Sequence, residues 1–177
     1  MAKPATASDI EQLMRRIDRL EALEQNRQQP AKYPLSVDMR NFDAVANLFV
    51  EDVTVSRSKS GRAAMKKWYA GALRGHVIGS AHGVAGHIID FEDDENLATG
   101  LVYSRNDLET ADRWMIEMMA YLDRYERRDG VWYFQRRTPL FWYQCDITDP
   151  PIGGGESKIR WKDQEWAAGA FHDAFPT

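Results

Sequence analysis

Apolar and polar positions alternate along the chain with two different periods, and the change of period separates two groups of predicted elements. Apolar residues first recur at helical spacing from Ile10 to Leu23. Pro30 and Pro34 interrupt this pattern, so the first helix is predicted to end between residues 25 and 29. Two further helices are predicted, at residues 34–49 and 62–73.

From residue 87 onward the period falls to two, which is typical of strands. Asp129-Gly130 is a hairpin signal between the last two of these segments. Helices followed by a meander of strands indicate an α+β fold. Strands are predicted at residues 53–56, 87–91, 97–105, 113–127 and 131–143, and the glycine-rich segment 75–86 is predicted to be a loop.

Length and composition predict one compact domain with a C-terminal extension. The chain has 177 residues, of which 1–148 would form the domain and 149–177 the extension. Pro150-Pro151 and three glycines at 153–155 break any element, yet aromatic residues follow. A disordered tail would contain few aromatic residues, so this segment is expected to pack on the domain or on a neighbouring subunit.

Charge and cysteine content limit the partners and the location of the protein. The net charge is −4, so neither nucleic acid nor an anionic membrane is an expected partner. A single cysteine, together with the lack of an apolar leader or spanning segment, favours the cytoplasm. The apolar face of the helix at residues 10–23, together with the aromatic tail, predicts a homodimer or homotrimer.

Several polar residues stand where chemistry is possible, although the pattern leaves their roles open. Glu117 lies among apolar neighbours, so it faces either water or a cavity in which its pKa would rise. Arg136 and Arg137 must point to opposite faces of their strand, and one of them would face the interior.

No phosphate loop and no ligand set with metal spacing stand out, so we expect neither cofactor nor metal. The six tryptophans fit either a filled core or a pocket for an aromatic ligand.

Three segments together resemble the SnoaL-like family of the nuclear-transport-factor-2-like superfamily. The likeness covers roughly residues 8–143, and the order and spacing of the motifs carry it rather than any one of them. The motifs are Tyr33-x4-Asp38-x2-Asn41-Phe42-Asp43-x4-Leu48-Phe49-x2-Asp52-Val53, then Gly61-Arg62-Ala63-Ala64-Met65 leading to Ser80-Ala81-His82, and finally Leu97 to Gly100 with Tyr103, Tyr121 to Glu126, Asp129-Gly130-x-Trp132 and Arg136-Arg137.

The resemblance implies a cone-like, curved mixed β-sheet that surrounds a cavity and is closed by the helices of residues 8–73. It also implies that Asp38 faces the cavity and pairs with His82, and that Tyr33 donates a hydrogen bond to the reacting group. An aspartate that orients a histidine supplies a base able to work near neutral pH. The residues expected to contact the substrate are Tyr103, Arg105, Glu117 and Arg137.

Family members such as scytalone dehydratase, bile-acid 7α-dehydratase and diarylpropane formaldehyde-lyases imply a cofactor-independent lyase. Its substrate would be a small hydroxylated aromatic or polycyclic molecule that loses water or formaldehyde. An isomerase or cyclase with the same pocket, or a non-catalytic binding or assembly subunit, remains an alternative, because the fold alone does not determine function.

Overall fold

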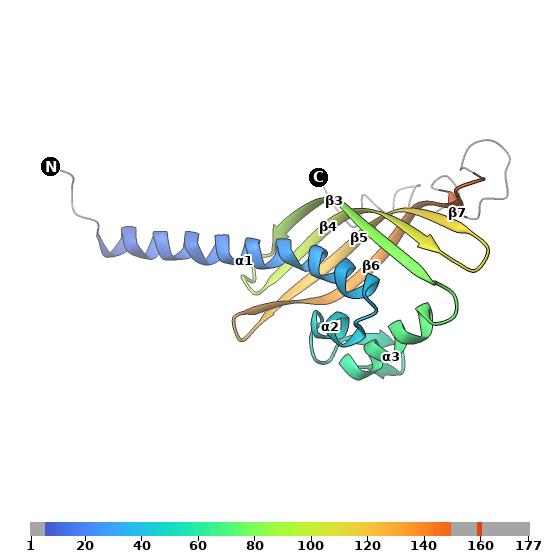
Figure 1. Ribbon diagram of the computed structural model, residues 1–177. Helices are drawn as coiled ribbons and strands as arrows, with labels where there is room; N and C mark the ends of the chain where they lie inside the picture. Colours follow the sequence, from blue (N-terminus) through green and yellow to red (C-terminus); the bar gives the residue numbers. More distant parts are fainter. Residues whose placement is uncertain (1–5, 150–158, 161–177) are drawn as a thin grey trace.

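The computed structural model describes residues 6–149 and the backbone of residues 159–160. Figure 1 shows helix α1 crossing one face of a curved sheet, with α2 and α3 gathered at one end. The predicted α+β fold, a curved sheet closed by N-terminal helices, is confirmed. The elements in chain order are α1 (Ala7–Asp38), α2 (Phe42–Asn47), β1 (Thr54–Ser56), β2 (Lys59–Ser60), α3 (Arg62–Leu73), β3 (Gly79–Phe91), β4 (Leu97–Glu109), β5 (Trp114–Arg128), β6 (Val131–Asp146) and β7 (Ile159–Arg160).

Antiparallel pairing joins β3, β4, β5, β6 and β7 in that order, and β1 pairs with β2 separately. The pairing register shifts at Val84/Gly86, at Met118/Met119 and at Arg124/Tyr125. Such bulges bend a strand and increase its twist, which accounts for the curvature of the sheet. A parallel bridge between Phe49 and Phe134 ties the segment after α2 to β6.

Helix α1 continues through both prolines, so the predicted end between residues 25 and 29 is wrong. Pro30 and Pro34 lie on the buried stripe of the helix. A proline inside a helix costs about 3 kcal/mol or more, because it removes a hydrogen bond and crowds the preceding turn. Burial of that stripe against the sheet outweighs this cost here. The buried residues of α1 are Ala22, Asn26, Gln29, Pro30, Tyr33, Pro34 and Val37.

Two further boundaries differ from the prediction. The segment predicted as one helix at 34–49 is divided by a turn in which Arg40 has a φ of 57°, and the Asn41 side chain then caps α2. The predicted loop at 75–86 is a strand from Gly79 onward. Its glycines have low strand propensity, but pairing with β4 along the whole length of β3 overrides that preference. His82 therefore stands on a rigid strand.

The core lies between α1, α2 and the concave face of the sheet, and Tyr125, Trp132 and Phe134 are among its fully buried members. The backbone of Ile159–Arg160 pairs with Tyr143 and Gln144 of β6. The predicted packing of the tail aromatics lies outside the described residues, so the division at residue 148 stays a prediction. Within the described residues, no helix combines the length and apolarity needed to cross a bilayer.

Candidate functional site

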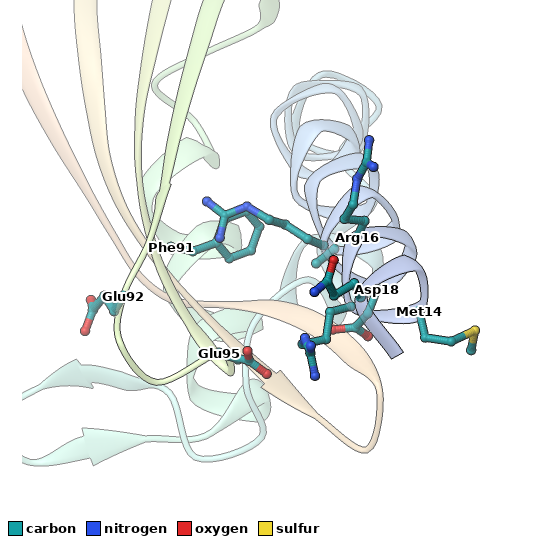
Figure 2. Close-up of a pocket in the computed structure, with 10 residues that line it drawn as sticks. Met14, Arg16, Asp18, Phe91, Glu92 and Glu95 are labelled. Carbon is teal, nitrogen blue, oxygen red and sulfur yellow. The ribbon is translucent and has the colours of Figure 1, made fainter. Parts of the chain in front are cut away.

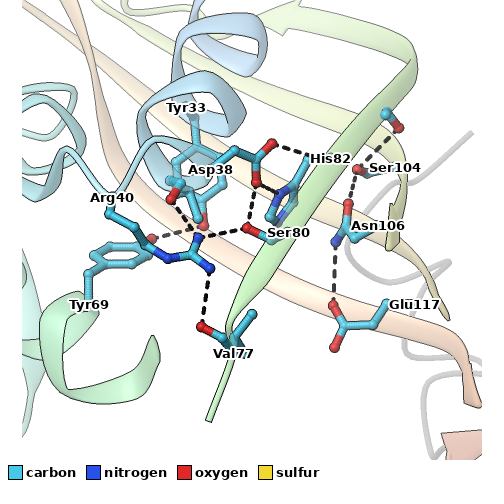
Figure 3. Close-up of polar contacts among 12 residues, drawn as sticks. Tyr33, Asp38, Arg40, Tyr69, Val77, Ser80, His82, Ser104, Asn106 and Glu117 are labelled. Atoms are coloured by element: carbon cyan, nitrogen blue, oxygen red, sulfur yellow. Dashed lines mark hydrogen bonds and ion pairs between the residues drawn. The ribbon is translucent and has the colours of Figure 1, made fainter. Parts of the chain in front are cut away.

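The last residue of α1, Asp38, holds His82 by two contacts (Figure 3). Asp38 Oδ2 accepts a hydrogen bond from the His82 backbone N–H at 3.0 Å, and Oδ1 lies 2.7 Å from His82 Nδ1. The exposed fractions of the two side chains are 9% for His82 and 22% for Asp38. An ionised Asp38 places the ring proton on Nδ1, which leaves Nε2 as an acceptor. The pairing expected from the resemblance is thus present in the structure.

Two residues fix the position of the Asp38 carboxylate. Ser80 Oγ donates to Asp38 Oδ1 at 2.7 Å, and Arg40 Nη1 donates to Ser80 Oγ at 2.7 Å. Arg40 also donates to the carbonyl group of Val37 and to that of Val77 (Figure 3). Because these carbonyls belong to α1 and to the segment before β3, Arg40 ties the end of the helix to the strand that carries His82. Sequence reasoning missed Arg40, since its role depends on the turn after α1.

A row of polar side chains runs across the sheet from His82. In the strand register His82 pairs with Asn106, Asn106 with Glu117, and Glu117 with Gln144. Directly paired residues of neighbouring strands point to the same face, so the row shares the concave face. Asn106 Nδ2 lies 3.4 Å and Gln144 Nε2 2.6 Å from the Glu117 carboxylate, to which both donate. Burial raises the pKa of Glu117, and the two amides oppose that shift.

Asn106 and its neighbour Ser104 were not predicted as site residues. Ser104 Oγ donates to Asn106 Oδ1 at 2.6 Å, and both side chains are fully buried. Period two does place them on one face of their strand. The sequence contains no signal, however, for the register that sets Asn106 beside His82 on one side and Glu117 on the other.

Three tyrosines lie beside this row. Tyr69 Oη donates to Tyr33 Oη at 3.0 Å, and the ring of Tyr33 packs edge-on against Tyr121 with centroids 5.9 Å apart. Tyr121 Oη accepts from Asn106 Nδ2 at 3.4 Å, which connects the tyrosines to the polar row. Burial raises the pKa of Tyr33 and brings that of Tyr69 to about 12, so both phenols stay protonated at neutral pH. Each can therefore donate a hydrogen bond.

Arg137 points into the interior, which decides between the two adjacent arginines. Its Nε lies 3.0 Å from Asp123 Oδ1, and both side chains are almost fully buried. Its guanidinium carbon lies 4.0 Å from the Tyr121 ring centre and 4.3 Å from that of Tyr33. The contact between Nε and Asp123 is an ion pair that lacks hydrogen-bond geometry, and Nη1 is buried with no hydrogen-bond partner among the described residues. Arg137 is therefore buried on the interior side of the tyrosines, and its guanidinium group packs against their rings.

Tyr103 and Arg105 do not join the site. Alternate residues of β4 are buried, namely Val102, Ser104 and Asn106. Tyr103 and Arg105 therefore point to the opposite, convex face. Arg105 is exposed and lies 3.6 Å from Asp107, while the ring of Tyr103 packs near Trp142. The expectation that they share the cavity with His82 is wrong, because the strand register places the even-numbered residues inside.

A second polar chain lies deeper in the cone. Tyr125 Oη lies 3.0 Å from His87 Nε2 and donates to Asp123 Oδ2 at 2.9 Å. Burial lowers the pKa of His87 to about 4 and raises that of Asp123 to about 6. His87 is therefore neutral at physiological pH, and Asp123 is largely ionised against Arg137.

An open groove of about 700 Å³ lies elsewhere, between the N-terminal half of α1 and the β3–β4 turn (Figure 2). Arg16 and Asp18 border it on the helix, and Phe91 and Glu95 border it on the sheet side. None of the residues around the Asp38–His82 pair contributes to it. In the described part of the chain, no group of three or more acidic, histidine or cysteine side chains is arranged to hold a metal ion.

Solved structures with the same fold include enzymes that act on small molecules. A type 2 hexachlorocyclohexane dehydrochlorinase (LinA) is 18% identical with a TM-score of 0.67, over 81% of this chain and 99% of that one. A Novosphingobium aromaticivorans protein described as a candidate scytalone dehydratase is 26% identical with a TM-score of 0.62, over 78% and 98%. No curated protein sequence matches the chain.

The family comparison covers most of α1, the strands β1 to β5 and the first half of β6. The model of the SnoaL-like domain matches residues 18–138, which is well over half of the chain. This range contains Asp38, His82 and Glu117. The chain belongs to the SnoaL-like domain family.

Proposed function

We propose that the protein is a cofactor-independent lyase that acts on a small hydroxylated aromatic or polycyclic molecule and releases water or formaldehyde. The observation that carries the proposal is the contact between Asp38 and His82 Nδ1 at 2.7 Å, with His82 Nε2 left as the acceptor. Relatives with the same fold include a dehydrochlorinase and a candidate dehydratase, which are lyase-type enzymes.

In the proposed reaction His82 Nε2 removes a proton from the substrate, and Asp38 stabilises the imidazolium that forms. For loss of water the proton comes from carbon, its electron pair forms a new double bond, and the carbon–oxygen bond breaks. For loss of formaldehyde the proton comes from a primary alcohol. The carbon–carbon bond then breaks, and its electron pair forms the double bond as a neighbouring benzylic hydroxyl leaves.

Glu117 and Tyr33 are the proposed partners of His82 in this reaction. The leaving hydroxyl needs a proton, and Glu117 retains one to a higher pH than an ordinary carboxyl group. Tyr33 accepts from Tyr69, so its own hydroxyl proton is available to donate to an oxygen that gains negative charge. The tyrosines around the row favour an aromatic substrate, because flat rings stack or pack edge-on with one another.

A panel of hydroxylated aromatic compounds, incubated with the wild type and with His82→Ala, tests the proposal. We expect a product that has lost the mass of one water, or of one formaldehyde together with one water, formed by the wild type only. A product of unchanged mass that also depends on His82 would instead identify an isomerase or cyclase. No product from any compound, together with co-purification of a larger metal-containing subunit, would favour a non-catalytic assembly role.

A further inference from the structure

The first half of α1 extends away from the rest of the protein (Figure 1), and it carries an uncovered apolar stripe. The stripe consists of large side chains with exposed fractions between 39% and 63%. Every residue from Thr6 to Glu21 is exposed. We call this segment the α1 arm, and the members of its stripe are Ile10, Leu13, Met14, Ile17 and Leu20.

Apart from Met14, which borders the open groove beside the β3–β4 turn, the stripe faces away from the protein's own sheet. The arm contacts the sheet through Asp18, which pairs with Arg127 at 2.8 Å, and through Arg19, whose guanidinium carbon lies 4.8 Å from the Phe91 ring centre. At 100° per residue, Leu13 and Ile17 lie on roughly the opposite side of the helix from the buried Ala22. A rearrangement of the sheet or of α1 that covered the stripe would therefore break these contacts.

An arm of this kind lacks the main source of helix stability. It continues into the rest of the 32-residue α1 and needs no nucleation of its own, but tertiary packing supplies most of the stability of a helix in a protein. The arm gains little such packing within its own chain, while its apolar side chains remain in contact with water. A second surface that covers the stripe would stabilise the helix and remove apolar area from water together.

We propose that the α1 arm pairs with the same arm of a second copy as a short, parallel, two-stranded coiled coil. Its core residues follow the spacing of a heptad seam, with Ile10 and Ile17 at the a positions and Leu13 and Leu20 at the d positions. Isoleucine at a with leucine at d favours two strands over three or four. The seam ends at Glu24, where the next a position is charged.

The charges beside the seam favour the parallel orientation. In this register Arg16 occupies a g position and Glu21 the following e position, and a parallel pair places each Arg16 opposite the other chain's Glu21. An antiparallel pair would set Arg16 against Arg16. Neither Arg16 nor Glu21 has an ion-pair or hydrogen-bond partner of its own within the described residues.

The two folded bodies do not obstruct this pairing. Each body lies on the side of its own arm away from the seam, so the order across the dimer is body, helix, helix, body. Asp38 lies at the far end of the same helix, which leaves His82 and the concave face clear of the interface. The interface is therefore independent of the proposed lyase function.

Sedimentation of the full-length protein at micromolar concentration tests the pairing. We expect a dimer whose dissociation constant rises at least about 100-fold in Leu13→Asp, because a charge would enter the seam. Leu35→Asp is the matched control: Leu35 is an exposed residue of the same helix beyond the end of the seam, and this variant should remain dimeric. A monomeric wild type, a larger oligomer, or a dimer unaffected by Leu13→Asp would overturn the proposal. A monomer would leave the chain's own tail, or a different partner, as the cover of the stripe.

Orientation is tested by charge exchange and by cross-linking. Arg16→Glu should weaken the dimer about tenfold, and adding Glu21→Arg in the same chain should restore it.

Leu13→Cys should form a disulfide-linked dimer on mild oxidation, because equivalent positions face each other in a parallel pair. The native Cys145 is buried and serves as the built-in control. Cross-linking only between a Leu13→Cys chain and an Ile17→Cys chain would show an antiparallel pair and contradict the proposal.

Discussion

Asp38 holds the backbone and the ring of His82 at the same time, with one carboxylate oxygen on each. The backbone contact fixes where the strand passes the end of α1, and the ring contact fixes the orientation of the imidazole. A histidine placed in this way needs no rearrangement before it accepts a proton, which is the condition for efficient general-base catalysis.

Removal of either member of this pair should abolish most of the turnover. General acid–base catalysis contributes about 10²- to 10⁴-fold, so His82→Ala and Asp38→Asn should each lower kcat by at least about 10²-fold. KM should change less, because the pair acts mainly in the transition state. His76→Ala, which alters an exposed histidine outside the site, should retain wild-type kinetics. Wild-type turnover in His82→Ala would refute the mechanism.

The pKa of Glu117 should determine the pH above which activity falls. Burial raises its pKa, and as a proton donor it must be protonated. Activity should therefore fall as the pH rises through this raised pKa. Glu117→Gln cannot donate a proton, so it should lower kcat by about 10²-fold and remove this dependence on pH. A Glu117→Gln enzyme with an unchanged pH profile would show that the carboxyl group only binds or positions.

The Arg137–Asp123 pair should behave as a structural element beneath the tyrosines. Arg137→Met leaves Asp123 buried without its counter-charge and should reduce the free energy of unfolding by about 3–5 kcal/mol in urea denaturation. Adding Asp123→Leu removes the second charge and should recover most of that loss. An Arg137→Met variant with wild-type stability would contradict this structural role.

Gly100 should tolerate no side chain. A Cβ atom there would lie 2.7 Å from Tyr125 Cε2 and 3.1 Å from His87 Nε2. Gly100→Ala should therefore displace the Tyr125 hydroxyl and reduce stability by about 1–3 kcal/mol. Gly86, on the neighbouring strand, has open space around the same position, so Gly86→Ala is the control and should cost much less. Equal thermal melting temperatures for the two variants would contradict this packing.

His87 should make the protein sensitive to acid. Its pKa is about 4 in the folded chain and near the usual 6.5 when unfolded, so unfolding takes up a proton between these values. The stability that it contributes is therefore lost as the pH falls from about 6.5 to about 4. Asp123 has the opposite slope over part of this range, because its pKa is raised to about 6.

The comparison that isolates His87 uses His87→Gln, which cannot take up a proton. The difference in unfolding free energy between wild type and variant should shrink steadily as the pH falls through that window, as measured by urea denaturation at a series of pH values. A constant difference would mean that His87 has the same pKa in the folded as in the unfolded protein.

The sequence alone determined the class of fold and the identity of the central pair. Periodicity separates helices from strands without reference to contacts, and the Asp129-Gly130 hairpin follows from backbone conformations with positive φ, which both residues adopt. Asp38 and His82 were identified because their order and spacing relative to surrounding motifs resemble a known family. Their contact follows from the fold that those motifs specify.

Only the tertiary structure decided the rest of the site. Whether α1 continues through Pro30 depends on how much it buries against the sheet, which local propensity does not encode. The register of β4 placed Asn106 inside and Tyr103 outside, since a shift of one residue reverses every side chain of a strand. The register of β6 likewise decided that Arg137, and not Arg136, points into the interior. Local pattern fixes the period of an element, whereas its phase relative to its neighbours is set by long-range packing.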